Sequence, residues 1–63
     1  MKSIETIRTN ILNAIRAKNA CENKHLASEA ERTIDIALRH LNAGRMADAA
    51  EQADMAMGML GLI

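Results

Sequence analysis

The first 43 residues of the chain contain neither glycine nor proline, the two residues that most often interrupt regular secondary structure. The chain also lacks Phe, Tyr, Trp and Val, so its large apolar side chains are Ile, Leu and Met. Valine and the aromatic residues favour strands, whereas Ala, Leu, Met, Glu, Lys and Arg, which are abundant here, favour helices. We therefore expect an all-α fold. At 63 residues the chain is shorter than an ordinary domain, so we expect a single helical domain over residues 1–63 with a small core.

An N-terminal helix is predicted over residues 4–18. Four isoleucines recur there at spacings of three and four residues, which places them on one face of an α-helix; they are Ile4, Ile7, Ile11 and Ile15. Ser3 directly precedes them, and a serine hydroxyl commonly caps the first turn of a helix. We expect this isoleucine face to be buried.

The segment NACENKH, residues 19–25, interrupts the periodicity with two Asn, which favour caps and turns over helix interiors. It is either a turn or a continuous, bent helix, and we expect a turn. Two pairs have the spacing of a capping box, the weaker being Asn19 with Glu22 and the better being Ser28 with Glu31.

A helical hairpin is predicted from helices at about 25–43 and 46–60. Gly44 separates them and can end the first helix with a positive φ angle. The hairpin helix at about 25–43 has an apolar face at helical spacing, made of Ala30, Ile34, Ala37, Leu38 and Leu41. The second offers a face of small residues and methionines that suits close packing on it, made of Met46, Ala49, Ala53, Ala56, Met57 and Leu60.

A second apolar stripe is predicted on the last helix, where Met55, Met59 and Leu62 stand at i, i+4 and i+7. One interpretation is that the N-terminal helix covers this stripe within the chain, and another is a frayed tail. We favour a third, in which the stripe forms a homodimer seam or docks a partner helix, because methionine-rich faces adapt to other surfaces. Ile36 lies opposite the main face of the middle helix and is predicted to join the same interface.

Charges balance overall but not along the chain. Residues 1–18 carry four basic side chains and one acidic, a net charge of +3, whereas residues 46–63 carry three acidic and no basic side chains. We expect Arg8 and Arg16, which flank Leu12 on the first helix, to pair with acidic groups of the last helix, within the chain or between subunits; these are Asp48, Glu51 and Asp54. The alternative is a small DNA-binding or transcriptional accessory dimer that uses Arg8, Arg16 and Lys18.

No catalytic, cofactor or metal site is predicted. Cys21, His25 and His40 offer fewer than the four ligands of a structural zinc site, and a nucleophilic cysteine would need a positioned base and an oxyanion site. A single cysteine cannot form an internal disulfide, so self-association is the usual remaining way to stabilise so small a chain. The longest uncharged apolar run, residues 55–63, is too short to span a membrane, and no signal peptide is seen. We expect a cytoplasmic protein.

The segment ALRHLNAGRMADAAEQADMAM, residues 37–57, resembles the turn and second helix of a tetratricopeptide repeat. Gly44, Met46, Ala49 and Ala56 match the small and apolar positions of that repeat, although His40 and Ala53 replace bulkier residues. The resemblance implies a helical hairpin and no peptide-binding groove.

The whole chain, from MKSIETIRTNILNAIRAKNACENKH to GRMADAAEQADMAMGML, is similar to the short early proteins of the exo–xis region of lambdoid bacteriophages. This resemblance implies a non-enzymatic phage accessory protein in the host cytoplasm, associated with disturbing the host cell cycle and replication and with favouring lytic growth over lysogeny. Such proteins are thought to act by contact with host or phage proteins, and the resemblance carries no residue-level site. An antitoxin-like protein is a further hypothesis.

Overall fold

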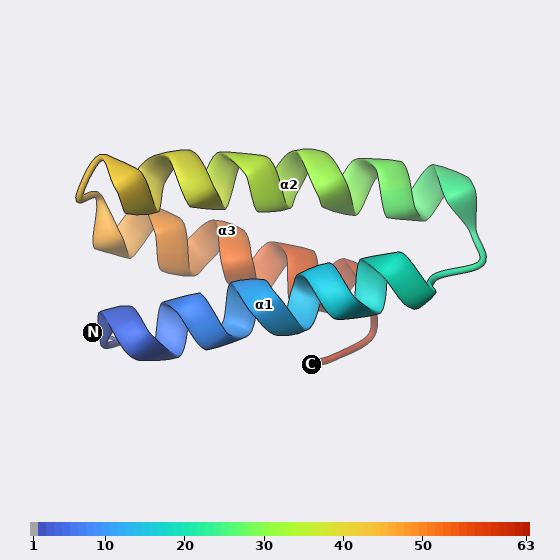
Figure 1. Cartoon of the computed structure of the whole chain (residues 1–63), viewed down its shortest axis with the longest axis horizontal. Coiled ribbons are helices and arrows are strands. Elements are labelled where there is room, and N and C mark those ends of the chain that lie inside the picture. The colour runs from blue at the N-terminus through green and yellow to red at the C-terminus, as the bar shows by residue number, and fades with distance from the viewer. Residues whose placement is uncertain (1) are drawn as a thin grey trace.

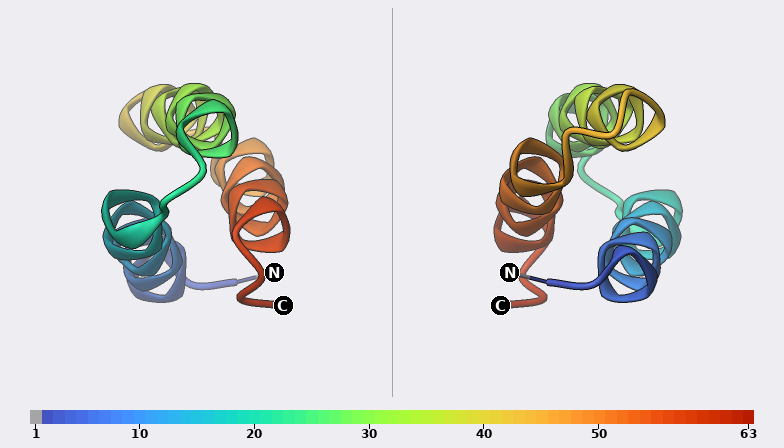
Figure 2. Two further views of the ribbon diagram at one scale, coloured as in Figure 1. Left: turned by 90° about the vertical axis from the view of Figure 1, so that its right-hand side faces the viewer. Right: turned by 90° about the vertical axis from the view of Figure 1, so that its left-hand side faces the viewer.

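The computed structural model describes residues 2–63 and contains three α-helices, shown in Figure 1. They are α1 (Ile4–Ala20), α2 (Lys24–Asn42) and α3 (Met46–Met59), and the described residues contain no strand. The all-α prediction and its three helices are confirmed, with bounds that differ by one or two residues. Seen end-on, the helices occupy three corners of a triangle, and the short segments before α1 and after α3 lie at the side between these two helices (Figure 2). None of the helices in residues 2–63 has the length and apolar character needed to cross a lipid bilayer.

The start of α1 follows the prediction. Ser3 is the N-cap, and its hydroxyl accepts a hydrogen bond from the backbone N–H of Thr6 at 3.2 Å. The isoleucine face is only half buried, however. Ile7 and Ile11 lie in the core, whereas Ile4 stays 40% exposed.

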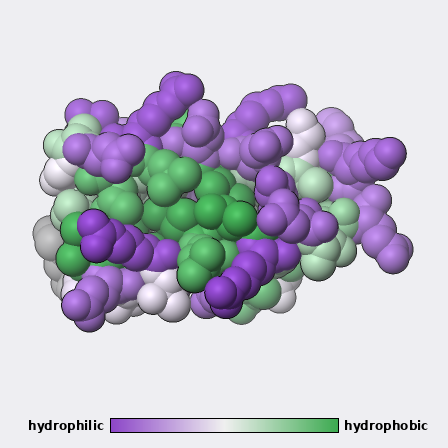
Figure 3. Space-filling view, viewed as in Figure 1, coloured by the Kyte–Doolittle hydropathy of each residue, from purple (hydrophilic) through white to green (hydrophobic). Residues whose placement is uncertain are grey.

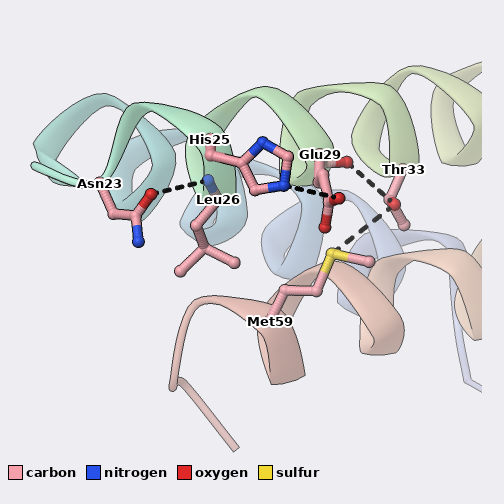
Figure 4. Close-up of polar contacts among 6 residues, drawn as sticks. All are labelled: Asn23, His25, Leu26, Glu29, Thr33 and Met59. Atoms are coloured by element: carbon pink, nitrogen blue, oxygen red, sulfur yellow. Dashed lines mark hydrogen bonds and ion pairs between the residues drawn. The ribbon is translucent and has the colours of Figure 1, made fainter.

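The segment between α1 and α2 is a turn, as predicted, because Cys21 and Asn23 have extended backbone conformations. Both predicted capping pairs are wrong: Asn19 lies inside α1 and Ser28 inside α2. The cap is Asn23, whose side-chain Oδ1 accepts the Leu26 N–H at 3.0 Å (Figure 4). Since Asn is among the best N-cap residues, α2 begins a turn earlier than a Ser28 cap would allow.

Gly44 ends α2 as predicted, with φ of +80°. The Arg45 N–H donates to the His40 carbonyl at 2.9 Å, and the Gly44 N–H donates to the Leu41 carbonyl at 3.1 Å. These two bonds define a Schellman motif, which satisfies carbonyls at the helix end.

A second Schellman motif ends α3, and the sequence analysis did not predict it. Gly61 has φ of +76°, and the Leu62 N–H donates to the Met57 carbonyl at 2.9 Å. The helix therefore stops at Met59, and Leu62 does not continue the stripe of Met55 and Met59.

The two glycines Gly44 and Gly58 give a matched test, since an added Cβ would meet nothing within 4 Å at either position. Gly44→Ala is expected to cost about 1–2 kcal/mol of unfolding free energy, because alanine disfavours a positive φ. Gly58→Ala is expected to stabilise by up to about 1 kcal/mol, because Gly58 lies within α3 at an ordinary helical φ. Urea unfolding followed by circular dichroism measures both, and equal signs would contradict the assigned conformations.

The core is formed by all three helices but contains few large side chains. Among residues 2–63 the ten buried apolar residues include six alanines; the others are Ile7, Ile11, Ile34 and Met57. The predicted packing faces of α2 and α3 both contribute to this core, and the alanines let their backbones approach closely.

Candidate functional site

An open groove of about 510 Å³ runs between α1 and α2. Its apolar floor consists of Ile15 from α1 with Ile34 and Leu38 from α2, and its rim is polar and charged; the rim residues are Lys18, Ser28, Glu31, Arg32 and Asp35. Ile34 is buried, at 5% exposed, whereas Ile15 and Leu38 are only partly buried against the core. The groove therefore opens the edge of the hydrophobic core to solvent.

Exposed residues of α1 extend this apolar surface. Ile4 precedes Ile15 by eleven residues, which is three helical turns, so the two lie along one line of α1. Leu12 lies beside that line and is 45% exposed. Figure 3 shows a continuous hydrophobic area across the middle of the face formed by α1 and α2, bordered above and below by hydrophilic groups. We call this surface, consisting of Ile4, Leu12, Ile15, Ile34 and Leu38, the α1–α2 face.

The rim of the groove carries both signs of charge. The Lys18 Nζ lies 3.7 Å from the Glu31 Oε1, which joins the two helices across one end of the groove. On α2 the Arg39 Nη2 lies 3.1 Å from the Asp35 Oδ2. Arg32 makes no ion pair among residues 2–63. A ligand in the groove would thus meet an apolar floor with charged groups beside it.

The sequence analysis missed the α1–α2 face because it assigned the isoleucine stripe and Leu38 to the interior. In the structure α3 lies against one side of both helices, so the opposite side of the α1–α2 pair has no third helix above it (Figure 2). The signal that could have been used is Leu12, an apolar residue one turn from Arg8 on one side and from Arg16 on the other.

The residues of the predicted methionine interface do not all lie on one exposed surface. Met55 on α3 and Ile36 on α2 are both exposed, at 46% and 41%. Met59 is half-buried, and its sulfur lies 3.8 Å from the Thr33 hydroxyl of α2 (Figure 4). This contact places Met59 between the two hairpin helices.

Leu62 is exposed as well, but it lies elsewhere. It contributes to a second groove of about 590 Å³ between α1 and the end of the chain, whose other lining residues are Asn10, Asn13, Arg16, Ala17, Met57 and Ile63. The reversal at Gly61 turns Leu62 towards α1 and away from the face of Met55.

The predicted pairing of Arg8 and Arg16 with the acidic end of the chain does not occur within residues 2–63, where neither arginine forms an ion pair. Both are exposed. Instead, Lys2 makes the contact between the two ends, with its Nζ 2.6 Å from the Asp54 Oδ1. Lys2 precedes α1, so this ion pair joins the segment before α1 to α3.

The groups considered for chemistry are dispersed. The Cys21 thiol lies 3.5 Å from the carbonyl oxygen of Asn23. His25 is exposed, with its Nε2 3.2 Å from Glu29 (Figure 4), and the His40 Nδ1 accepts a hydrogen bond from the Arg45 Nε at 2.9 Å. Within residues 2–63 no three His, Cys, Asp or Glu residues lie close enough to hold a metal ion.

Comparison with known proteins gave no match to a family model, to a curated protein or to a solved structure. The α1–α2 face, its charged rim and the exposed residues of α1 are the observations from which a function can be proposed.

Proposed function

We propose that this chain is a non-enzymatic accessory protein that acts by contact with another protein, and that the α1–α2 face is its docking surface. The observation that carries the proposal is the open groove between two helices, whose apolar floor consists of the partly exposed Ile15 and Leu38 with the buried Ile34. In a protein this small, leaving such a surface open forgoes burial that would otherwise stabilise the fold. A docking role explains why it stays open.

The occupant that fits this face is an amphipathic helix. The groove is bounded by two helices, so a third helix lying in it would be surrounded in the manner of a helix bundle. Its apolar stripe would cover the floor, and its flanking charges would meet the rim, which holds Lys18 and Arg32 as well as Glu31 and Asp35. A rim of mixed charge favours a ligand that also carries both signs.

A role without catalysis is supported by the surroundings of the reactive side chains. The Cys21 thiol faces a backbone carbonyl, and His40 is engaged by Arg45. Neither arrangement pairs a nucleophile with a base, which nucleophilic catalysis requires.

The cellular setting of the proposal rests on the resemblance to the early exo–xis proteins of lambdoid phages. On that basis the chain would act in the host cytoplasm, disturb the host cell cycle or replication, and favour lytic growth over lysogeny. Its targets would be host or phage proteins, and any such contact must use an exposed surface of the kind described here.

The DNA-binding alternative has less support. Arg8 and Arg16 are exposed, but the third proposed contact, Lys18, already lies beside Glu31. The chain carries eight basic and eight acidic residues, whereas nucleic-acid-binding domains are usually basic overall.

Expression of the chain in a bacterial host of lambdoid phages tests the proposal, with cell length and DNA content per cell as readouts. Wild type is expected to change both. Leu38→Glu and Leu12→Glu are expected to abolish the change, because each places a carboxylate in or beside the apolar floor. Ile36→Glu is the matched control, since it makes the same kind of change on an exposed position of α2 away from the groove. Circular dichroism confirms that each variant is folded.

Two outcomes would contradict this function. If wild type leaves both readouts unchanged, the proposed effect on the host cell cycle or replication is wrong. If all four proteins act equally, the α1–α2 face is not the docking surface. Loss of activity in Ile36→Glu alone would transfer the role to the surface around Ile36 and Met55.

A further inference from the structure

We infer that the α1–α2 face is occupied by helix α1 of a second copy of the chain, packed antiparallel to α1 about a two-fold axis near residue 10. This inference rests on the proposed function, because the second copy covers the same docking surface and a target protein would bind there in its place. It is based on three observations. Two pairs of residues on α1, one apolar and one charged, share a spacing of eleven residues. The charged pair has no ion-pair partner within the described chain, and the other exposed apolar surface, around Met55 on α3, is flanked by acidic residues.

The apolar residues of α1 are self-complementary in this arrangement. Ile4 and Ile15 lie eleven residues apart on one line of the helix. An antiparallel second copy centred near residue 10 brings its Ile15 against Ile4 of the first, and its Ile4 against Ile15. Leu12 lies near the centre of the contact, and the same register places it beside Arg8 of the second copy, since Arg8 lies one turn before Leu12 on α1. The two-fold symmetry repeats each contact, as in most dimers.

Two of the four charged residues of α1 follow the same spacing. Glu5 and Arg16 are also eleven residues apart, on the side of α1 next to Leu12. At about 1.5 Å per residue they are roughly 16 Å apart along the axis, too far to pair within one chain. Both are exposed, and neither forms an ion pair among residues 2–63. The same antiparallel register brings Glu5 of each copy beside Arg16 of the other, which gives two reciprocal ion pairs.

The second copy also supplies apolar burial that the chain itself lacks. Six of the ten buried apolar residues in the described chain are alanines. Covering Ile4, Leu12, Ile15 and Leu38 would add large side chains to a shared core of α1 and α2 from both copies. Small folds without disulfides or metals often gain their stability from such association.

The exposed hairpin surface around Met55 suits a second copy less well. Asp48 and Glu51 precede Met55 by seven and four residues, on the same side of α3, and both are exposed. No basic residue lies on α3, so two copies packed there through α3 would give these carboxylates no ion-pair partner on the facing helix. In the dimer inferred here, Met55 and Ile36 remain on the outside.

A charge-swap series measured by sedimentation tests the inference. Wild type is expected to be dimeric at micromolar concentration. Glu5→Arg and Arg16→Glu are each expected to raise the dissociation constant about tenfold, because both ion pairs become like-charge pairs. The double variant Glu5→Arg/Arg16→Glu is expected to recover dimerisation, since the pairs are restored with exchanged signs. Glu22→Arg, in the exposed turn before α2, is the control and is expected to leave the constant unchanged.

The double variant also separates ion pairing from helix stability. Glu5 lies in the first turn of α1, where an acidic residue favours the helix, so Glu5→Arg weakens α1 slightly. The double variant keeps Arg at position 5. Its recovery therefore cannot come from the helix terminus, and failure to recover would overturn the proposed register.

Disulfide trapping provides an independent measurement of the register, in the background Cys21→Ser. A mixture of chains carrying Ile4→Cys with chains carrying Ile15→Cys is expected to form a covalent dimer under mild oxidation, whereas each chain alone is not. Covalent dimers of the Ile4→Cys chain alone would indicate a parallel arrangement and overturn the inference.

A monomeric wild type would also overturn this inference without affecting the proposed function, provided that Leu38→Glu still abolishes the effect on the host cell. That pair of results would assign the α1–α2 face to a different protein. A dimer with the charge-swap behaviour but no effect on the host cell would support the dimer inferred here and contradict the proposed function.

Discussion

Replacing Ile7 with alanine is expected to lower the unfolding free energy by about 2–5 kcal/mol. Ile7 is fully buried on α1, where it packs within the cluster that includes Ile11, Ile34 and Met57. Removing three carbon atoms from its side chain loses their burial and leaves a cavity that neighbouring alanines are too small to fill.

This loss is large compared with the total free energy of unfolding expected for so short a chain. At roughly 0.05–0.15 kcal/mol per residue, a chain of this length has a stability of about 3–9 kcal/mol. Ile7→Ala is therefore expected to shift the urea midpoint sharply, or to leave much of the protein unfolded at 25 °C. Ile36→Ala removes the same atoms at a position that is 41% exposed, so it is expected to cost clearly less. Similar losses in the two variants would show that α1 does not bury the face described here.

Local signals in the sequence were sufficient to predict the secondary structure. The isoleucine spacing with Ser3 predicted the start of α1, and Gly44 predicted the end of α2. Both signals act within one or two helical turns, because a cap or a positive φ is a property of a few neighbouring residues. The cap of α2 was missed because capping-box spacing singled out Asn19 and Ser28, whereas Asn23, the actual cap, has no Glu or Gln three residues after it.

The surfaces were harder to predict, since they depend on where a whole helix lies relative to the others. Periodicity showed that Ile4 and Ile15 share a line of α1 with core residues nearby, but not which side of that line α3 would cover. It also projected Leu62 onto the face of Met55, because the stripe assumed a helix that continues past Gly61. Helical periodicity identifies a face only as far as the helix extends.

The charged residues show the same limit. The opposite charges of the two chain ends suggested contact between them, and one such contact exists, from Lys2 to Asp54. The sequence analysis chose Arg8 and Arg16 for it, because both lie on a predicted helix. The side of α1 that meets α3 is a matter of tertiary packing, and it leaves these arginines facing solvent.

A change that adds volume to the alanine core is expected to have the other large effect on stability. Ala53 is 1% exposed on the face of α3 that packs into the core with Ala49 and Ala56. Ala53→Leu inserts three carbon atoms where two helices approach closely, so the helices must move apart or the side chain must leave its preferred rotamer. A cost of about 1–3 kcal/mol is expected, and more if the helices cannot separate.

The matched control for this variant is Ala47→Leu, which makes the same change at an exposed position of α3. Alanine and leucine differ little in helix propensity, so the control is expected to be nearly neutral, and the difference between the variants isolates the packing cost. Thermal unfolding measures both. Met57, one turn after Ala53 on the same buried face, is the flexible neighbour best able to adapt. Combining Ala53→Leu with Met57→Ala should therefore recover part of the loss if overpacking is the cause, whereas an additive further loss would mean that the two side chains fill separate spaces.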